Sequence, residues 1–266
     1  MPGTLTCRGL VDGPQPGTVN MAIDEVLLES GVQGVSSLRF YQWDRPTVSL
    51  GHFQAVQSGE AGRAVVPPRF HSLPVVRRLS GGGAILHDQE LTYSCVLASG
   101  HELTPNPVAL YDRIHQAIID TLAELGVACR MRGDEAFADQ SFLCFSRGDA
   151  RDIVFRGHKI VGSAQRRRQG VILQHGSLLL SRSACAEEFP GIAELSGVSL
   201  SASQLIPLLR SRILEQLQLT GRAAGQSLGQ SAGLTPAEQA RVQAITPACA
   251  VTVSRATLPV SKTTSP

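Results

Sequence analysis

Short strand-like runs crowd the middle of the chain, and one strong helix pattern divides them. Three apolar runs follow one another closely between residues 75 and 97, and the last, 91–97, alternates apolar and hydroxyl side chains as a half-buried strand does. Asn106 and Pro107 then open an amphipathic helix that Gly126 closes. Strand patterns resume after it. This order predicts an α+β fold in which helices flank a mixed sheet.

The remaining elements follow from periodicity and turn residues. We expect a helix over 19–27 with Thr18 as its cap, a loop over 54–74, a helix over 205–219, and a capping box at Thr235 and Glu238. The expected strands are 37–43, 47–50, 75–79, 84–86, 91–97, 127–131, 153–155, 160–161, 171–173 and 178–180. Because the composition changes after residue 181, we expect a main domain over 1–182 and a helical C-terminal extension with a frayed tail over 183–266.

Composition and charge exclude several classes of protein. Apolar residues make up 42% of the chain and charged residues 17%, which fits a globular protein with a core. The net charge of +2 gives no strong attraction to nucleic acid. No apolar run approaches the ~18 residues of a membrane helix, and the first residues do not resemble a signal peptide. The six cysteines include no CxxC pair, so we expect no metal site, no disulfide framework and a cytoplasmic location.

A glycine-rich segment is the first candidate for a binding site. Residues 77–88 read RRLSGGGAILHD, and three consecutive glycines can adopt positive φ and present backbone N–H groups to a ligand. Arg77 and Arg78 beside them favour an anionic or carbonyl-bearing ligand. The segment matches neither the GxxxxGK[ST] nor the GxGxxG nucleotide motif. The alternative is a simple hairpin turn.

Lys159 is the second candidate, because lysine is scarce in this chain. Of 24 basic residues only Lys159 and Lys262 are lysines, and Lys262 lies in the tail. Arginine is larger and cannot give up its proton, so a site that needs a compact, deprotonatable amine would retain lysine. The small residues 162–164 follow it and suggest a turn that a substrate approaches closely. The alternative is an ordinary surface lysine.

Cys144 and His175 are further candidates. Cys144 has apolar neighbours, so it is either a reactive thiol or a buried small hydrophobe. His175 stands in the sequence QHGS between two apolar runs, where it is either an acid–base group or a hydrogen-bonded turn residue.

Taken in order, residues 77–88, 159–165 and 174–180 resemble the lipoate-protein ligase and octanoyltransferase family, which is related to the biotin protein ligases. The segment 20–25, the Arg45-Pro46 pair and residues 49–51 also match, so the resemblance covers about residues 19–180. It implies a biotin/lipoyl protein ligase-like mixed sheet flanked by helices.

Within that family the chain looks most similar to the cysteine-dependent octanoyl-[acyl carrier protein]:protein N-octanoyltransferases. Cys144 precedes Lys159 by fifteen residues, and Arg166-Arg167 and residues 173–177 also match that branch. Residues 146–150 depart from its common pattern.

The resemblance implies that Cys144 carries the octanoyl group as a thioester and that Lys159 is its thiolate partner and proton carrier. A free cysteine is mostly protonated at neutral pH. An ammonium at ~4 Å stabilises a thiolate by about 4 kcal/mol at an effective dielectric of ~20, less the cost of desolvation. The substrate-binding residues implied are Arg77, Ser80, Gly81, Gly82, Gly83, Ala84, His87, Gly162, Ser163, Ala164, His175 and Gly176.

The implied donor is octanoyl-acyl carrier protein, the acceptor is a lysine of a lipoyl domain or of glycine cleavage H protein, and no cofactor is required. Three alternatives stay open. An ATP-dependent lipoate-protein ligase would need ATP and Mg²⁺, and an amidotransferase would move the octanoyl group between lipoyl domains. A non-catalytic module that binds lipoyl domains or acyl carriers would form no acyl adduct.

Overall fold

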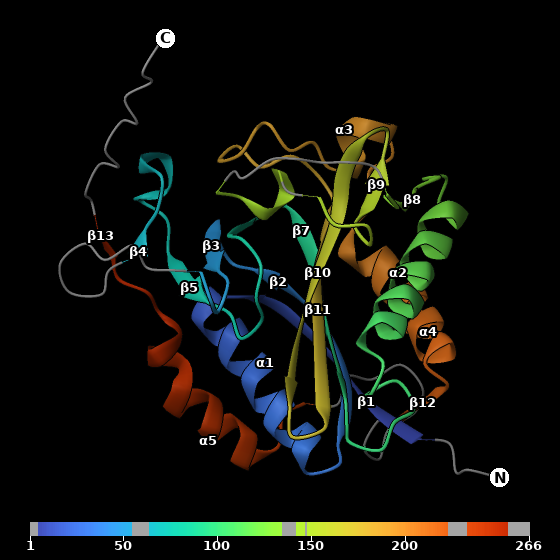
Figure 1. Ribbon diagram of the computed structural model, residues 1–266. Coiled ribbons are helices and arrows are strands. Elements are labelled where there is room, and N and C mark those ends of the chain that lie inside the picture. The colour runs from blue at the N-terminus through green and yellow to red at the C-terminus, as the bar shows by residue number, and fades with distance from the viewer. Residues whose placement is uncertain (1–4, 55–63, 135–141, 147, 223–232, 255–266) are drawn as a thin grey trace.

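A large mixed sheet with helices on both faces forms the body of the protein (Figure 1). The computed structural model describes residues 5–54, 64–134, 142–146, 148–222 and 233–254. Its helices are α1 (Gly17–Val32), α2 (Pro107–Glu124), α3 (Ile192–Ser196), α4 (Ala202–Gln216) and α5 (Pro236–Ile245), with 3-10 turns η1 (Pro68–Phe70), η2 (Cys144–Ser146) and η3 (Thr246–Cys249).

The main sheet has the strand order β12-β1-β2-β7-β11-β10-β9-β8. Its strands are β1 (Leu5–Gln15), β2 (Ser36–Trp43), β7 (Glu90–Leu97), β8 (Arg130–Met131), β9 (Ile153–Phe155), β10 (His158–Arg168), β11 (Val171–Leu179) and β12 (Leu219–Arg222). Strands β2 and β12 run parallel to β1, and the other pairs are antiparallel. A small sheet orders β5 (Val75–Arg77), β3 (Thr47–Leu50) and β6 (Ile85–His87), and β4 (Ala64–Val65) pairs with β13 (Val253–Ser254).

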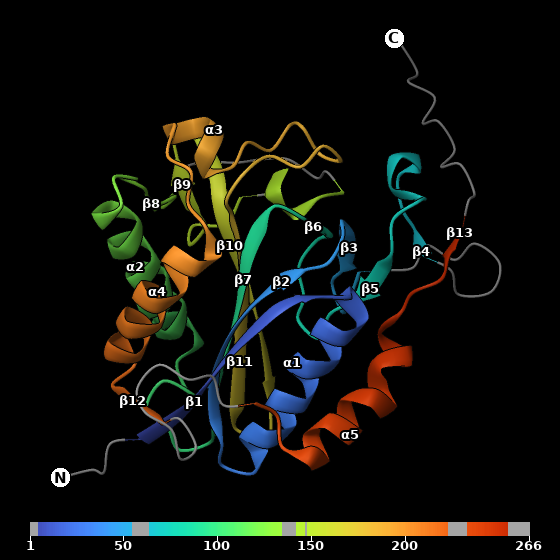
Figure 2. The ribbon, with the colours of Figure 1, turned by 180° about the vertical axis from the view of Figure 1, so that it is seen from behind.

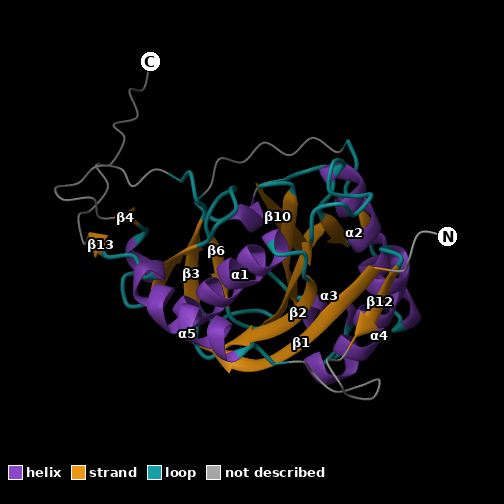
Figure 3. Ribbon diagram, turned by 90° about the horizontal axis from the view of Figure 1, so that it is seen from below, coloured by secondary structure: helices purple, strands orange, loops and turns teal. Residues whose placement is uncertain are grey.

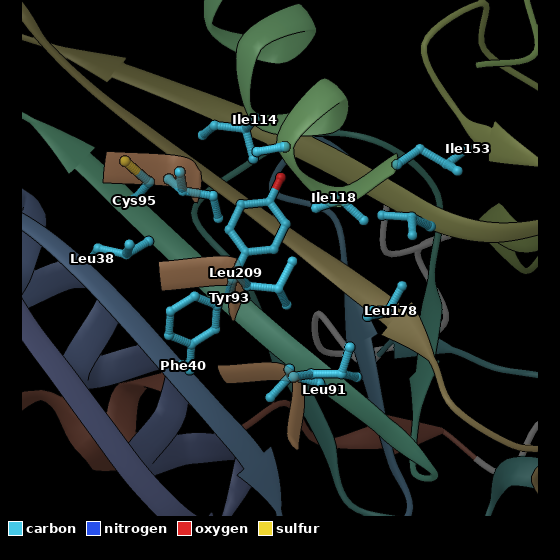
Figure 4. Packing of buried hydrophobic residues seen from close by; sticks show 14 of the residues in the cluster. Leu38, Phe40, Leu91, Tyr93, Cys95, Ile114, Ile118, Ile153, Leu178 and Leu209 are labelled. Atoms are coloured by element: carbon cyan, nitrogen blue, oxygen red, sulfur yellow. The ribbon is translucent and has the colours of Figure 1, made fainter. Parts of the chain in front are cut away.

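Helices α2 and α4 cover one face of the main sheet, and α1 with α5 covers the other (Figure 3). On the first face Tyr93 of β7 lies among Ile114 and Ile118 of α2 and Leu209 of α4 (Figure 4). Each such large apolar side chain contributes on the order of 1.5–3 kcal/mol by leaving water. The α+β fold expected from the sequence is therefore confirmed.

Coverage of both faces makes one strand expectation wrong. Every residue of β7 is buried, whereas its alternating pattern predicted a half-buried strand. Thr92 tolerates burial because its hydroxyl donates a 2.6 Å hydrogen bond to Glu90 and accepts one of 2.9 Å from the Trp43 indole.

Two expected turns are also wrong. Residues 162–164 and 174–177 lie inside β10 and β11, which pair without interruption from Val161–Leu178 to Arg168–Val171. The turn between these strands is at Gln169 and Gly170, both with positive φ.

The glycine-rich loop is not a hairpin turn either. Strands β5 and β6 do not pair with each other, because β3 lies between them. The loop therefore crosses the end of β3.

Helix ends agree with the sequence in part. Asn106 caps α2 by accepting a hydrogen bond from the Ala109 N–H, and Thr235 and Glu238 form the expected capping box. Thr18 is not a cap, because α1 begins at Gly17 directly after Pro16. Of the strand expected over 127–131, only β8 forms. In the expected loop over 54–74 the structure describes β4 and η1, while residues 55–63 and the tail 260–266 lie outside the described residues.

The segment after residue 182 contributes mainly helices. Strand β12 adds to the edge of the main sheet beside β1, and α4 packs on α2 (Figure 2). Arg8 of β1 binds Glu238 of α5 through two 2.8 Å hydrogen bonds. The division of the chain at residue 182 stays a prediction. Within the described residues, no helix combines the length and hydropathy needed to cross a membrane.

Candidate active site

Cys144 lies beside the end of the glycine-rich loop. Its backbone N–H donates a 2.6 Å hydrogen bond to the Ala84 carbonyl, and Leu143 forms a parallel bridge with Ala84. This bridge attaches η2 to the start of β6. The half-buried Cys144 thiol lines a pocket of about 510 Å³, counting the space at its mouth.

Lys159 points into the same pocket from the start of β10. Its ammonium nitrogen lies 3.8 Å from Cys144 Sγ and 3.4 Å from the Cys144 carbonyl oxygen. The side chain crosses Gly162, where an added Cβ would lie 2.6 Å from Lys159 Cε and 3.0 Å from Nζ. Glycine at 162 therefore gives the lysine room to reach the thiol.

Asp152 holds the lysine from the other side, and sequence reasoning missed it. Lys159 Nζ is 2.8 Å from Asp152 Oδ1, and both side chains are buried. Burial raises the pKa of the Asp152 carboxyl, while the charge of Lys159 opposes this shift. Because Asp152 neutralises part of the ammonium charge, Lys159 stabilises a Cys144 thiolate less than a lone ammonium would.

The two arginines beside the glycines brace the loop. Arg78 donates to the carbonyl oxygens of Ser49, at 2.9 Å, and of Gly81 and Gly83, both at 2.7 Å. Arg77 donates to the carbonyl of Gly51 at 2.9 Å. Burial lowers the pKa of Arg78 to about 10. Arg78 lines the pocket, and Arg77 does not.

Glycine is required at two positions, Gly82 for its backbone conformation and Gly51 for a close backbone contact. Gly82 has a φ of 91°. A Cβ on Gly51 would lie 2.1 Å from the Gly82 carbonyl oxygen, a backbone atom that cannot swing away. The loop is therefore packed against the end of β3, with Gly81 and Gly82 facing the pocket.

His175 is held by a buried chain of polar groups. Its Nδ1 lies 3.0 Å from Asp24 Oδ2, and its Nε2 contacts the Ser80 hydroxyl. Burial would raise the pKa of Asp24, but the hydrogen bond from His175 and the charge of Arg39 lower it. Asp24 therefore accepts from Nδ1, and Nε2 shares a hydrogen bond with the Ser80 hydroxyl. Ser80 is fully buried and does not line the pocket, and its hydroxyl contacts the His175 ring.

His87 occupies another wall of the pocket. Its ring stacks on Trp43 at 3.9 Å between centroids, and its Nδ1 lies 2.6 Å from Glu90 Oε1. Within the described residues its buried Nε2 has no hydrogen-bond partner. Met21 and Tyr41 line the same pocket, so it joins apolar surface to a few fixed polar groups.

Ser163 joins the pocket to a network behind it that sequence reasoning also missed. His115 Nδ1 donates to the Arg151 carbonyl at 2.6 Å, so its Nε2 accepts from the Ser163 hydroxyl at 2.7 Å. Burial lowers the pKa of His115 to about 4, which keeps the ring neutral at pH 7. The Tyr93 hydroxyl lies 2.7 Å from Ser163 Oγ.

The structure brings most of the expected site residues together. Those that line the pocket are Gly81, Gly82, His87, Cys144, Lys159, Gly162, Ser163, Ala164, His175 and Gly176. Those that do not are Arg77, Ser80, Gly83 and Ala84. Lining residues that were not expected are Met21, Tyr41, Ser49, Arg78, Ile85, Thr92, Phe145 and Ser177. Of these, Arg78 stands beside the glycines, and Met21, Ser49, Ile85 and Ser177 lie within segments that match the family but were not singled out.

A thiol next to an ammonium, both facing a pocket, is the arrangement of an activated nucleophile with a proton carrier. Across the described ranges, no group of three or more His, Cys, Asp or Glu side chains could hold a metal ion.

Curated relatives of this chain are named octanoyltransferase LipM. The protein of Oceanobacillus iheyensis is 37% identical over 175 residues, which are 65% of this chain and 63% of that protein. The protein of Geobacillus kaustophilus is 40% identical over 183 residues, and that of Symbiobacterium thermophilum is 42% identical over 182, with 65% of each chain covered in both pairs. The match thus spans less than two thirds of these relatives.

Solved structures share the fold. A putative lipoate protein ligase from T. acidophilum with bound lipoic acid has a TM-score of 0.71 at 20% identity, covering 92% of this chain and 96% of that one. A lipoate-protein ligase A bound with ATP has a TM-score of 0.68 at 21% identity, covering 91% and 95%.

The family model for the lipoyl protein ligase A/B catalytic domain matches residues 16–203. This range contains every residue of the pocket described above. The chain belongs to the lipoyl protein ligase A/B catalytic domain family.

Proposed function

We propose that the protein transfers an octanoyl group from octanoyl-acyl carrier protein to a lysine of lipoyl domains, through a thioester on Cys144 and without ATP. The observation that carries this proposal is the pair formed by Cys144 Sγ and Lys159 Nζ, 3.8 Å apart at the pocket. An adenylating ligase needs no thiol at this position. The names of the LipM relatives support the octanoyl group as the cargo.

In the first half-reaction the Cys144 thiolate attacks the thioester carbonyl of the donor. A new carbon–sulfur bond forms, and the bond to the sulfur of the carrier arm breaks. The departing thiolate takes a proton from the Lys159 ammonium. It thereby leaves as a free thiol on the carrier. Lys159 is then a neutral amine, still held in place by Asp152.

In the second half-reaction the neutral ε-amine of the acceptor lysine attacks the Cys144 thioester. Its excess proton passes to Lys159, and Cys144 departs as the thiolate. The products are an octanoyl amide on the acceptor and an enzyme in its starting state. Lys159 therefore gives one proton and takes one in each cycle, which an arginine cannot do.

The apolar lining of the pocket also supports an acyl chain as the transferred group. Met21, Ile85 and Phe145 provide apolar walls next to the nucleophile. Each buried methylene contributes about 0.8 kcal/mol of binding free energy. An eight-carbon chain therefore gains enough to bind in the pocket and to be distinguished from shorter chains.

The test is turnover with purified components. Octanoyl-acyl carrier protein and an apo-lipoyl domain should give an octanoylated domain without ATP, and Cys144→Ser should abolish this product. Cys185→Ser is the matched control, because Cys185 is also half-buried but lies outside the Cys144 pocket. A product that requires ATP and survives Cys144→Ser would identify a ligase. Turnover from an octanoylated lipoyl domain alone would identify an amidotransferase.

A further inference from the structure

Three consecutive arginines stand where β10 ends, far along the strand from Lys159. Arg167 and Arg168 are exposed and Arg166 is half-buried. We call Arg166, Arg167 and Arg168 the arginine ridge. Figure 1 places this end of the β10–β11 hairpin at the bottom of the molecule, between α1 and α2 and away from β8 and β9.

The ridge carries positive charge that lacks a partner. Within the described ranges none of its arginines lies within 4.0 Å of a carboxylate oxygen. Five other arginines pair with carboxylates: Arg45 with Asp44, Arg69 with Glu188, Arg151 with Asp112, Arg212 with Glu124 and Arg241 with Glu29. Arg156 and Arg182 are exposed single arginines that form no ion pair with a described residue, whereas the ridge places three such charges in a row. Arg168 helps to lower the pKa of Glu29. Glu29, however, already binds Arg241 through hydrogen bonds of 2.8 and 3.0 Å.

Strand β10 connects the ridge to the pocket. Gly162 and Ala164 line the pocket, and alternation places Arg166 on the same face of the strand. At ~3.3 Å per residue, Arg166 lies about 13 Å from Gly162 and Arg168 about 20 Å. Strand β9 pairs only with His158, Lys159 and Val161, so no described strand pairs with the outer edge of β10 beyond that point. From α2, the Tyr111 hydroxyl donates to the Ser163 carbonyl at 3.2 Å, and the Pro107 carbonyl accepts from Gln165 Nε2 at 2.8 Å. An extended arm can follow the face of β10 that carries Arg166, Ala164 and Gly162 from the ridge to the nucleophile.

We propose that the arginine ridge is the docking surface for the acyl donor, an acidic carrier protein that presents its thioester on a flexible arm attached through a phosphodiester. This proposal rests on the proposed function. Arg166 binds the phosphate, because a guanidinium matches phosphate oxygens with two parallel hydrogen bonds. Arg168, which alternation places on the same face as Arg166, meets carboxylates on the surface of the carrier, and Arg167 adds its charge from the other face of the strand. The arm then lies along β10 and places its thioester at Cys144.

A structural role is the competing explanation for the same charges. Charged side chains on an exposed edge strand prevent pairing with other chains. That role predicts aggregation when the charges are removed, but it predicts no dependence on which donor is used.

The test compares two donors on the full chain. The variant is Arg166→Glu/Arg168→Glu, and the donors are octanoyl-acyl carrier protein and octanoyl-N-acetylcysteamine, which has neither protein nor phosphate. KM for the carrier donor should rise about tenfold and depend less on salt, because the charges steer association. The rate with the small donor and KM for the lipoyl domain should not change. Arg166→Lys/Arg168→Lys keeps the charges but loses the paired hydrogen bonds of the guanidinium, so KM for the carrier donor should lie between those of the wild type and the glutamate variant.

The control is Arg45→Glu/Arg212→Glu, which makes the same change in net charge on other surfaces. An unchanged KM for the carrier donor, an equal rise in the control, or a rise confined to KM for the lipoyl domain would each overturn the proposal. Octanoylation of Cys144 by the small donor separates the two hypotheses. If it proceeds in all variants, the proposed function stands whatever the ridge does. If it fails in the wild type, the proposed function itself fails, and the docking proposal with it.

Discussion

Replacing Gly162 by alanine should slow the chemistry at Cys144 without unfolding the protein. The added Cβ would lie 2.6 Å from Lys159 Cε and 3.0 Å from Nζ. Both atoms belong to the far end of a flexible side chain, so the lysine gives way and the backbone does not. We therefore expect a loss of stability below about 1 kcal/mol, which is small for a substitution inside a sheet.

The substitution instead increases the distance between the Lys159 ammonium and the Cys144 thiolate. At the observed 3.8 Å, the ammonium and a thiolate attract by about 4 kcal/mol at an effective dielectric of ~20. Ordinary van der Waals contact requires the lysine end to retreat by about 1 Å, which reduces the attraction to about 3 kcal/mol. A loss of about 1 kcal/mol corresponds to about a fivefold lower rate.

The assay is the rate of Cys144 alkylation by iodoacetamide at pH 7, followed by mass spectrometry, with thermal unfolding measured in parallel. Gly13→Ala is the control, because no atom lies within 4 Å of a Cβ added there. An alanine at 162 that leaves the alkylation rate unchanged would refute the argument that the position of Lys159 controls the thiol. So would a large fall in melting temperature that accounts for the whole effect.

Three further predictions follow from the same geometry. Lys159→Arg keeps a positive charge but can neither give nor take a proton, so both the formation of the acyl-enzyme and its transfer to the lipoyl domain should slow, as seen by intact mass over time. Gly176→Ala should destabilise the protein by about 1–3 kcal/mol, measured by urea unfolding, because its Cβ would lie 2.3 Å from Ser163 Oγ and 2.9 Å from the Gly162 carbonyl oxygen. For His115, burial holds the pKa at about 4, below the ordinary value of 6.5. Its contribution is therefore present above pH 6.5 and lost as the pH falls toward 4, so about 2 kcal/mol should disappear between pH 7 and pH 5. His115→Gln should remove that part of the pH dependence in the same unfolding assay.

Local signals predicted much of the fold. Asn106 and the Thr235–Glu238 box act within one helical turn, so the sequence alone locates them. Residues 162–164 and 174–177 misled, because glycine and serine usually mark turns. Here the glycines serve close approach inside paired strands: Gly162 makes room for Lys159, and Gly176 makes room for Tyr93 and Ser163.

The site residues also fall into two groups, those that the sequence predicted and those that it did not. Cys144, Lys159 and the glycine-rich loop stood out through rarity or pattern, and the structure gathers them around one pocket. Asp152 and His115 did not, because an isolated acid or histidine has no periodicity and acquires its role only through tertiary contact. The distance from Lys159 to Asp152 could not be read from a spacing of seven residues across a loop and a strand.

Transfer of the acyl group to Cys144 is the central step of the proposed reaction. The direct measurement is peptide mass spectrometry after brief incubation with octanoyl-acyl carrier protein, without ATP and without acceptor. We predict one octanoyl group on the peptide that contains Cys144, none on the peptide that contains Cys185, and loss of the adduct when an apo-lipoyl domain is added. An adduct on Cys185 instead would contradict the thioester mechanism. So would an octanoylated acceptor that forms while Cys144 stays unmodified and that still forms when Cys144 is replaced by serine.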